Sequence, residues 1–141
     1  MTPRDTRTGR VLEEMIVPAL KRGGYEYETQ KVVGERPGGG RHTVDVVATG
    51  ADGQRYLISL KWQQVSGTAE QKVPFETMCL AEAVRDPQND YATAYLVLGG
   101  AGWRLREFYV SGALRDHLIH ADLVTVITLE DFVAKANAGE L

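Results

Sequence analysis

The segment from His42 to Gln64, HTVDVVATGADGQRYLISLKWQQ, contains two runs of apolar and β-branched residues on either side of a short turn. Runs of this composition predict β-strands. Ala51-Asp52-Gly53 fits a three-residue hairpin loop, in which a type I turn is followed by a left-handed residue, because glycine adopts that last conformation without steric cost. Gly50 then pairs with Gln54, and the segment is predicted to form an antiparallel hairpin.

This loop length sets the register of the two strands. Counting back from the turn places Asp45 opposite Ser59, and directly opposed residues share a face of the sheet. Lys61 lies diagonal to Asp45 on the same face, with Gln63 further along. A two-residue loop would instead place Asp45 opposite Leu60 and separate these polar residues, so the predicted polar cluster depends on the turn type.

The other face of the hairpin is apolar and is predicted to belong to the core; its residues are Val44, Val46, Ala48, Tyr56, Ile58, Leu60 and Trp62. A carboxylate on such a strand needs an explanation, because an unpaired buried charge is costly. Pairing between Asp45 and Lys61 alone would satisfy both groups. A functional role for Asp45 is the interpretation that we favour.

The composition is that of a compact folded protein. The chain has 141 residues, of which 43% are hydrophobic, and a single domain over residues 1–141 is expected. The apolar stretches are too short and too often interrupted by charges to indicate a signal peptide or a membrane span. The sole cysteine, Cys79, cannot form an internal disulfide, and its neighbours indicate a buried structural thiol. We expect a cytoplasmic protein with no membrane partner.

The charge is unevenly distributed along the chain, whose formal net charge is −3. Residues 1–72 hold 11 Lys/Arg against 9 Asp/Glu, a balance of +2, whereas residues 73–141 hold 5 against 10, a balance of −5. The N-terminal half is therefore the better candidate for a surface that faces a polyanion. An ordinary solvated surface explains this modest asymmetry almost as well.

The segments around the hairpin complete a mixed α/β pattern. Before it, helical spacing predicts one amphipathic helix over Thr6–Arg22, with Pro18 as a candidate kink, and alternation predicts a strand over Tyr25–Val33. After it, Thr68-x-x-Gln71 is a capping-box pattern at the start of a helix that contains Pro74. The remaining predicted elements are a strand at 91–100, a helix at 102–119 that is weakened near Gly112, a strand at 122–129 and a helix at 130–138. The order αβββαβαβα indicates one mixed sheet flanked by helices.

This order and the positions of Asp45 and Lys61 resemble the PD-(D/E)XK nuclease superfamily, over roughly the first 100 residues. The resemblance implies an α/β, restriction-endonuclease-like fold with an αβββαβ core, in which a central mixed β-sheet is flanked by helices. It also implies that Asp45 binds metal, that Lys61 is catalytic and that Glu13 is an acid on the first helix. Glu13 follows Gly9 by four residues, as a glutamate does in archaeal Holliday junction resolvases, and Glu14 is the alternative.

Two positions depart from the family pattern. Val44 stands where the motif has proline, a departure common in the family, and Ser59 stands where it has a second acid. One branch of restriction endonucleases has Ser-x-Lys on this strand and carries the acid on the following helix instead. Glu70 and Glu76 are the acids available there, and Glu76 is closer to the spacing of that branch. They are six residues apart, which at about 100° per residue is about 600° and places them on different sides of a helix. They are therefore not expected to bind the same metal ion.

These residue types are suited to hydrolysis of a phosphodiester. Mg²⁺, with Mn²⁺ as the expected substitute, prefers oxygen ligands and keeps several waters, so one or two carboxylates suffice to hold it. The candidate metal-binding positions are Asp45, Glu76, Glu70 and Leu60. The ion would activate a water and neutralise charge in the transition state, while Lys61 orients or helps to deprotonate that water.

Other polar residues are candidates for contacts with the lysine or with the substrate. Gln63, on the same strand face, could hold Lys61 or a phosphate, and it joins Asp45, Lys61 and Glu13 as a catalytic candidate. His42, His117 and His120 lack the paired spacing of a zinc site. The candidate substrate-binding residues are Ser59, Lys72, Arg10, Arg7, Arg36 and Arg41.

The sequence therefore predicts a metal-dependent DNA endonuclease. A homodimer is expected, because a chain this short offers one metal site, whereas cleavage of both strands of a duplex needs two. A restriction or nicking enzyme and a Holliday junction resolvase are both compatible with the motifs. The alternative is a catalytically silent nuclease-fold module that binds DNA or a protein partner, and the missing acid at position 59 is its main support.

Overall fold

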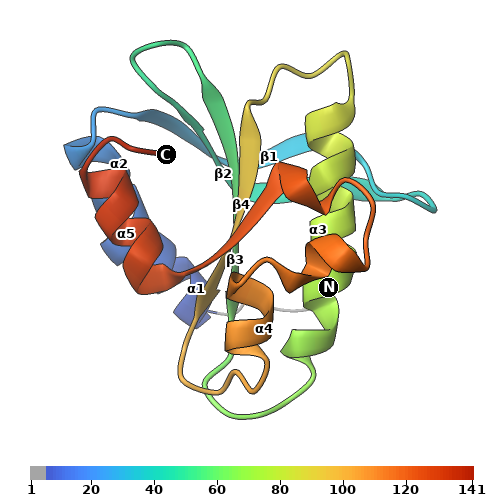
Figure 1. Ribbon diagram of the computed structural model, residues 1–141. Helices are drawn as coiled ribbons and strands as arrows, with labels where there is room; N and C mark the ends of the chain where they lie inside the picture. The colour runs from blue at the N-terminus through green and yellow to red at the C-terminus, as the bar shows by residue number, and fades with distance from the viewer. Residues whose placement is uncertain (1–5) are drawn as a thin grey trace.

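The computed structural model describes residues 6–141, which form a five-stranded mixed sheet (Figure 1). The strands lie in chain order: β1 (Glu26–Glu35), β2 (Arg41–Thr49), β3 (Arg55–Trp62), β4 (Thr93–Gly99) and β5 (Val124–Thr128). Pairing is antiparallel from β1 to β3 and parallel from β3 to β5. The parallel pairs need crossover connections, which α3 and α4 provide. The predicted mixed sheet is confirmed.

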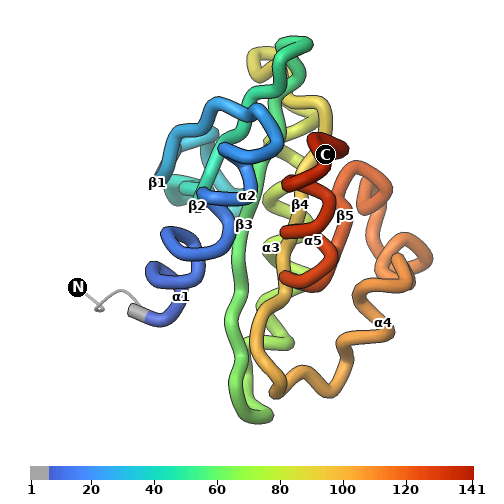
Figure 2. The backbone as a smooth tube through the Cα atoms, turned by 90° about the vertical axis from the view of Figure 1, so that its left-hand side faces the viewer, coloured from blue at the N-terminus to red at the C-terminus, as the bar shows by residue number. Residues whose placement is uncertain are grey.

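Helices cover both faces of the sheet (Figures 1 and 2). One face packs against α5 (Leu129–Asn137) and the N-terminal helix, which consists of α1 (Thr6–Val11), η1 (Leu12–Ile16) and α2 (Val17–Arg22). The other face packs against α3 (Ala69–Arg85), α4 (Arg106–Val110) and the 3-10 turns η2 (Ala113–Asp116) and η3 (Ala121–Leu123). The predicted order αβββαβαβα is confirmed, including the αβββαβ core. No helix within residues 6–141 is long and apolar enough to cross a membrane.

The N-terminal helix is continuous, as predicted, but Leu12–Ile16 forms a π-helical turn. The Val17 N–H there donates to the Leu12 carbonyl, one residue further back than in an α-helix. Pro18 follows directly and lacks the N–H that an α-helical bond to Glu14 would need. The wider turn thus accommodates the proline.

The helix α3 begins at Ala69 and passes through Pro74. Because proline has no N–H, it cannot donate to the Glu70 carbonyl one turn before it. The Tyr109 hydroxyl, from α4, donates to that carbonyl at 2.7 Å instead. The predicted capping box is wrong, because Thr68 has helical backbone angles and its side chain makes no capping hydrogen bond.

The predicted helix at 102–119 is divided in the structure. Trp103 is buried before the helix begins, and its Nε1 donates to the Gly99 carbonyl at 2.7 Å. After α4, Gly112 takes a left-handed conformation with φ of 85°, which ends the α-helical path, and the chain continues as η2. The prediction of a helix over 102–119 is therefore wrong as one continuous element, but the break falls at Gly112, where the sequence predicts a weak point.

The hairpin between β2 and β3 has the predicted turn. The Gly50 N–H donates to the Gln54 carbonyl at 2.9 Å, and Gly53 is left-handed with φ of 83°. Val46 pairs with Ile58 in the ladder that follows. This register is the predicted one as far as Val46 and Ile58, where the regular ladder ends, one residue short of the predicted pair of Asp45 and Ser59.

One core assignment in the hairpin is wrong. Val44 packs in the cluster under α3, not with Val46 and Ala48 on the other face. The neighbouring strand β1 is irregular at this level, because Gln30, beside Asp45, has a left-handed φ of 52°. The regular alternation of faces therefore ends near Asp45.

Candidate active site

One pocket gathers half of the predicted polar residues, including Asp45, Lys61 and Glu76. It has a volume of about 370 Å³ and lies between the N-terminal helix, β1, β2, β3 and the first turns of α3. The residues that line it are Thr8, Gln30, Arg36, Thr43, Asp45, Ser59, Leu60, Lys61, Trp62, Ala69, Lys72 and Glu76. The hairpin thus supplies one acid and the lysine, and α3 supplies a second acid.

Asp45 lies half-buried at the end of the regular β2–β3 ladder. Its Oδ2 accepts a hydrogen bond from the Leu60 N–H at 2.7 Å, so the strand that carries the lysine also orients the aspartate. The Leu60 side chain is buried in the apolar cluster on the opposite face. Its backbone carbonyl is therefore the group that Leu60 can offer to a metal ion.

Glu76 occupies the place beside Ser59 where the sequence lacks an acid. Its side chain comes from α3 and is only 5% exposed. Its Oε1 accepts a hydrogen bond from Ser59 Oγ at 3.4 Å and lies 3.0 Å from His42 Nε2. A carboxylate is thus present next to position 59, although the strand itself does not supply it.

The surroundings of Glu76 favour its charged form. Burial raises the pKa of this carboxyl, but the hydrogen bond with His42 and the positive charges of Lys61 and Arg36 outweigh burial and hold the pKa below the usual value of a glutamate. Glu76 is consequently ionised at neutral pH. A carboxylate must be deprotonated to bind a metal ion, so this environment fits a ligand.

Three cationic side chains line the same pocket. Lys61 is half-buried on β3, and Lys72 is exposed on the first turns of α3. Arg36 reaches the pocket from the β1–β2 loop, where its Nη1 donates to the Arg41 carbonyl at 3.0 Å. The Arg41 side chain is exposed and does not line the pocket.

Glu70 and Gln63 lie outside the pocket, although the sequence predicted both to belong to the site. The Glu70 carboxylate accepts hydrogen bonds from the backbone N–H groups of Arg104 and Leu105, at the start of α4. Gln63 follows the end of β3, and its Nε2 donates to the Gly102 carbonyl at 2.8 Å and to Glu70 at 3.3 Å. Both side chains tie the turn before α4 to α3.

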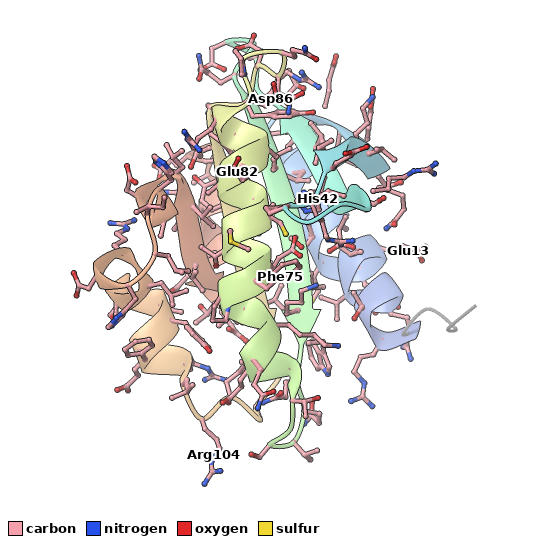
Figure 3. The ribbon with its side chains drawn as sticks, turned by 90° about the vertical axis from the view of Figure 1, so that its right-hand side faces the viewer. Glu13, His42, Phe75, Glu82, Asp86 and Arg104 are labelled. Carbon is pink, nitrogen blue, oxygen red and sulfur yellow. The ribbon has the colours of Figure 1, made fainter. Side chains whose placement is uncertain are left out.

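The predicted residues of the N-terminal helix also lie outside the pocket. Glu13 is exposed on the π-helical turn, on the side of the helix away from α3 (Figure 3). Arg10 pairs with Glu14 at 3.7 Å on the surface. Arg7 stacks over the ring of Trp62, 5.9 Å from its centroid, which places it at the edge of the pocket.

Sequence reasoning missed four polar residues in or beside the pocket. His42 is 1% exposed and lies beside α3, where it contacts Glu76 (Figure 3). Thr8, Gln30 and Thr43 line the pocket. The left-handed backbone of Gln30 and the partner of His42 depend on tertiary contacts, and the sequence carries no motif for either.

The pocket offers oxygen donors of the kind that Mg²⁺ prefers. Asp45 and Glu76 offer two carboxylates, and Leu60 offers a carbonyl. Residues 6–141 contain no group of three or more His, Cys, Asp or Glu side chains that could hold a metal ion. One or two carboxylates are sufficient for Mg²⁺, because this ion retains several of its waters. The donor set therefore fits the metal that the resemblance implies.

Comparison of sequences identifies a family. A family model described as a PD-(D/E)XK nuclease superfamily domain matches residues 4–140, nearly the whole chain. No curated protein matches the sequence.

Two solved structures are similar to this chain. One is a protein of unknown function, AF1548, with a TM-score of 0.50 and 16% identity, covering 80% of this chain and 54% of that one. The other is a repair endonuclease from Pyrococcus abyssi, with a TM-score of 0.41 and 13% identity, covering 91% of this chain and 47% of that one. The chain thus spans about half the length of each. At 16% identity the first likeness shows the fold alone, and the second is too weak to add to it.

Proposed function

Because this chain belongs to the PD-(D/E)XK nuclease superfamily, we propose that it is a metal-dependent endonuclease that hydrolyses phosphodiester bonds in DNA. The observation that carries this proposal is the position of Glu76. Its carboxylate lies 3.4 Å from Ser59 Oγ, in the pocket that Asp45 and Lys61 also line. The acid that the strand lacks is therefore replaced from α3.

The proposed metal is Mg²⁺, with Mn²⁺ as a substitute. Asp45, Glu76 and the Leu60 carbonyl would hold it, and waters would complete its coordination. When bound, the ion lowers the pKa of a water and stabilises negative charge on the phosphate oxygens. Asp45 is already oriented for this task by the Leu60 N–H.

The cationic side chains have separate proposed roles. Lys61 orients the attacking water, helps to deprotonate it and stabilises the charge of the transition state. Arg36 and Lys72, at the edge of the pocket, bind the phosphates that flank the scissile one. These three cations line the same pocket as the carboxylates of Asp45 and Glu76 and exceed them by one charge, and a bound metal ion would add to this positive charge toward a polyanion.

The proposal includes a homodimer, because one chain offers one such pocket and duplex cleavage requires two. A restriction or nicking enzyme and a Holliday junction resolvase remain the two candidates for its specificity. Comparing cleavage of a linear duplex with cleavage of a four-way junction distinguishes them. Sedimentation at micromolar concentration tests the dimer, and a strict monomer under those conditions would contradict it.

The test of nuclease activity is a plasmid assay with Mg²⁺, with Mn²⁺ and with a chelator. The parent protein is expected to nick or linearise DNA only when a metal ion is present, and Asp45→Asn is expected to abolish this activity without lowering thermal stability. If the parent leaves both plasmid and branched DNA intact, the chain is instead the catalytically silent module that position 59 suggested.

A second assay tests whether Glu76 replaces the acid that is missing at position 59. Glu76→Ala is expected to weaken metal binding and cleavage, because it removes one of the two carboxylates. Adding Ser59→Glu to this variant returns a carboxylate to the strand and is expected to restore part of the activity. Full activity in Glu76→Ala would show that the site does not use this acid.

A further inference from the structure

We propose that His42 is a positioning residue for Glu76: it fixes Oε1 of the carboxylate so that Oε2 is the oxygen presented to the metal ion. This inference rests on the proposed metal-dependent activity, and it assigns a role to a residue that no nuclease motif in this sequence includes.

The first support is the burial of the pair. His42 is 1% exposed and Glu76 is 5% exposed, and the contact at 3.0 Å joins β2 to α3, elements that are 34 residues apart at this point. Such a contact fixes the helix against the strand beside the pocket (Figure 3). A buried acid with no partner is costly, so the histidine also makes it possible for Glu76 to lie there in its charged form.

The second support is the distribution of contacts over the two carboxylate oxygens. His42 Nε2 and Ser59 Oγ both contact Oε1. Within the described part of the chain, Oε2 of Glu76 makes no hydrogen bond or ion pair. A carboxylate held by one oxygen presents the other as a single ligand, in a fixed direction.

The orientation matters because of the metal that the pocket fits. Mg²⁺ requires nearly ideal octahedral geometry, so a rotating carboxylate is a poorer ligand than a fixed one. Residues that orient metal-binding carboxylates commonly change metal affinity about 10- to 100-fold when they are replaced. Ser59 is then not the remnant of an acid but a second, longer contact to the acid that replaced it.

The experiment measures Mn²⁺ binding by titration calorimetry on the full chain without DNA, together with thermal unfolding. His42→Phe retains an aromatic ring but no donor, and it is expected to weaken Mn²⁺ binding about 10- to 100-fold. His42→Gln is expected to bind nearly as well as the parent, because its amide nitrogen reaches about as far as Nε2. His42→Asn is shorter and is expected to bind as poorly as His42→Phe. The exposed His117, replaced by Phe, is the matched control and should leave Mn²⁺ affinity unchanged.

A purely structural role would lower the unfolding temperature of the variants without this order of Mn²⁺ affinities. In a Glu76→Gln background, His42→Phe should cause no further loss, because its effect acts through that carboxylate. The inference is overturned if His42→Phe binds Mn²⁺ as tightly as the parent, or if His42→Gln and His42→Asn bind it equally. In either case, metal binding by the parent leaves the proposed function standing. A parent that binds no Mn²⁺ overturns both.

Discussion

Two buried glutamates on the same helix have different surroundings. Glu70 is 7% exposed and Glu76 is 5% exposed, and both lie on the first half of α3. The Glu70 carboxylate accepts from the backbone N–H groups that begin α4, whereas the Glu76 carboxylate contacts side chains at the edge of a pocket. Burial alone therefore does not distinguish a functional acid from a structural one. The hydrogen-bond partners distinguish the two acids. Backbone N–H groups hold the Glu70 carboxylate in place and leave it few free lone pairs with which to bind a metal ion.

The Glu70 end of α3 has a second structural contact. The Glu70 carbonyl, which Pro74 cannot satisfy, accepts from the Tyr109 hydroxyl. Gln63 adds a further link from the end of β3 to the carboxylate and to the Gly102 carbonyl. This end of the helix is a junction between β3, α3 and α4, and the Glu76 end faces the pocket.

Among the variants that test this comparison of the two ends of α3, Lys61→Met has the largest expected effect. The change removes the charge that assists the attacking water, and we expect metal-dependent cleavage to fall by roughly 100- to 10,000-fold. Lys61 is only half-buried, so the unfolding temperature should stay near that of the parent. Single-turnover cleavage rates and thermal unfolding measure the two effects.

Lys72→Met is the matched control for Lys61→Met, because Lys72 lines the same pocket from α3 but is exposed. This change should mainly lower the affinity for DNA, and it should also make that affinity depend less steeply on salt concentration. Equal losses of the cleavage rate in both variants would mean that the pocket has no specific catalytic lysine.

The second prediction concerns the structural glutamate. Glu70→Ala leaves the backbone N–H groups of Arg104 and Leu105 without their acceptor, and we expect a loss of about 1–3 kcal/mol in the free energy of unfolding. Cleavage per folded molecule should be unchanged, because Glu70 does not line the pocket. Urea unfolding and a cleavage assay at low temperature check both points. A stable but inactive Glu70→Ala would reverse the roles assigned to the two acids.

The third prediction tests whether the Tyr109 hydroxyl replaces the hydrogen bond that Pro74 cannot donate to the Glu70 carbonyl. Tyr109→Phe removes the donor to the Glu70 carbonyl and should cost about 1 kcal/mol in the free energy of unfolding. In a Pro74→Ala background the new N–H can donate to that carbonyl, so the same change should cost less. A double-mutant cycle by urea unfolding measures this coupling. Additive effects would show that the hydroxyl does not compensate for the proline.

The smallest effect is expected from Ser59→Ala. The hydroxyl contacts Glu76 at 3.4 Å, a long hydrogen bond, and its loss should reduce cleavage about 2- to 10-fold. This loss should be smaller than the one caused by His42→Phe in the same cleavage assay. A larger loss in Ser59→Ala would make the serine the main partner of the acid.

The sequence predicted those parts of the site that depend on local geometry. The turn at Ala51-Asp52-Gly53 determined the hairpin register, which is the predicted one from the pair Thr49–Arg55 to the pair Val46–Ile58. Helix periodicity separated Glu70 from Glu76, which point in different directions on α3. These predictions succeeded because each depends on a few neighbouring residues and on regular backbone.

The parts that the sequence did not predict depend on distant contacts. The partner of His42 lies 34 residues away, and a lone histidine on a strand has no spacing that indicates an acid. Gln63 was placed by strand alternation, but β3 ends at Trp62, so alternation no longer applies to it. Val44 was assigned to the wrong face because Gln30 distorts the adjacent strand.

The polar cluster and the apolar cluster on the face under α5 also differ in how much of the chain each one needs. The polar cluster of His42, Asp45, Ser59, Lys61 and Glu76 comes from one continuous segment, whereas this apolar cluster joins Val11 to Ala136. Closing a short segment costs less chain entropy than closing a long one. During synthesis from the N-terminus, all five polar residues therefore leave the ribosome before α5, the last helix, which contributes Leu129, Phe132 and Ala136 to the apolar cluster.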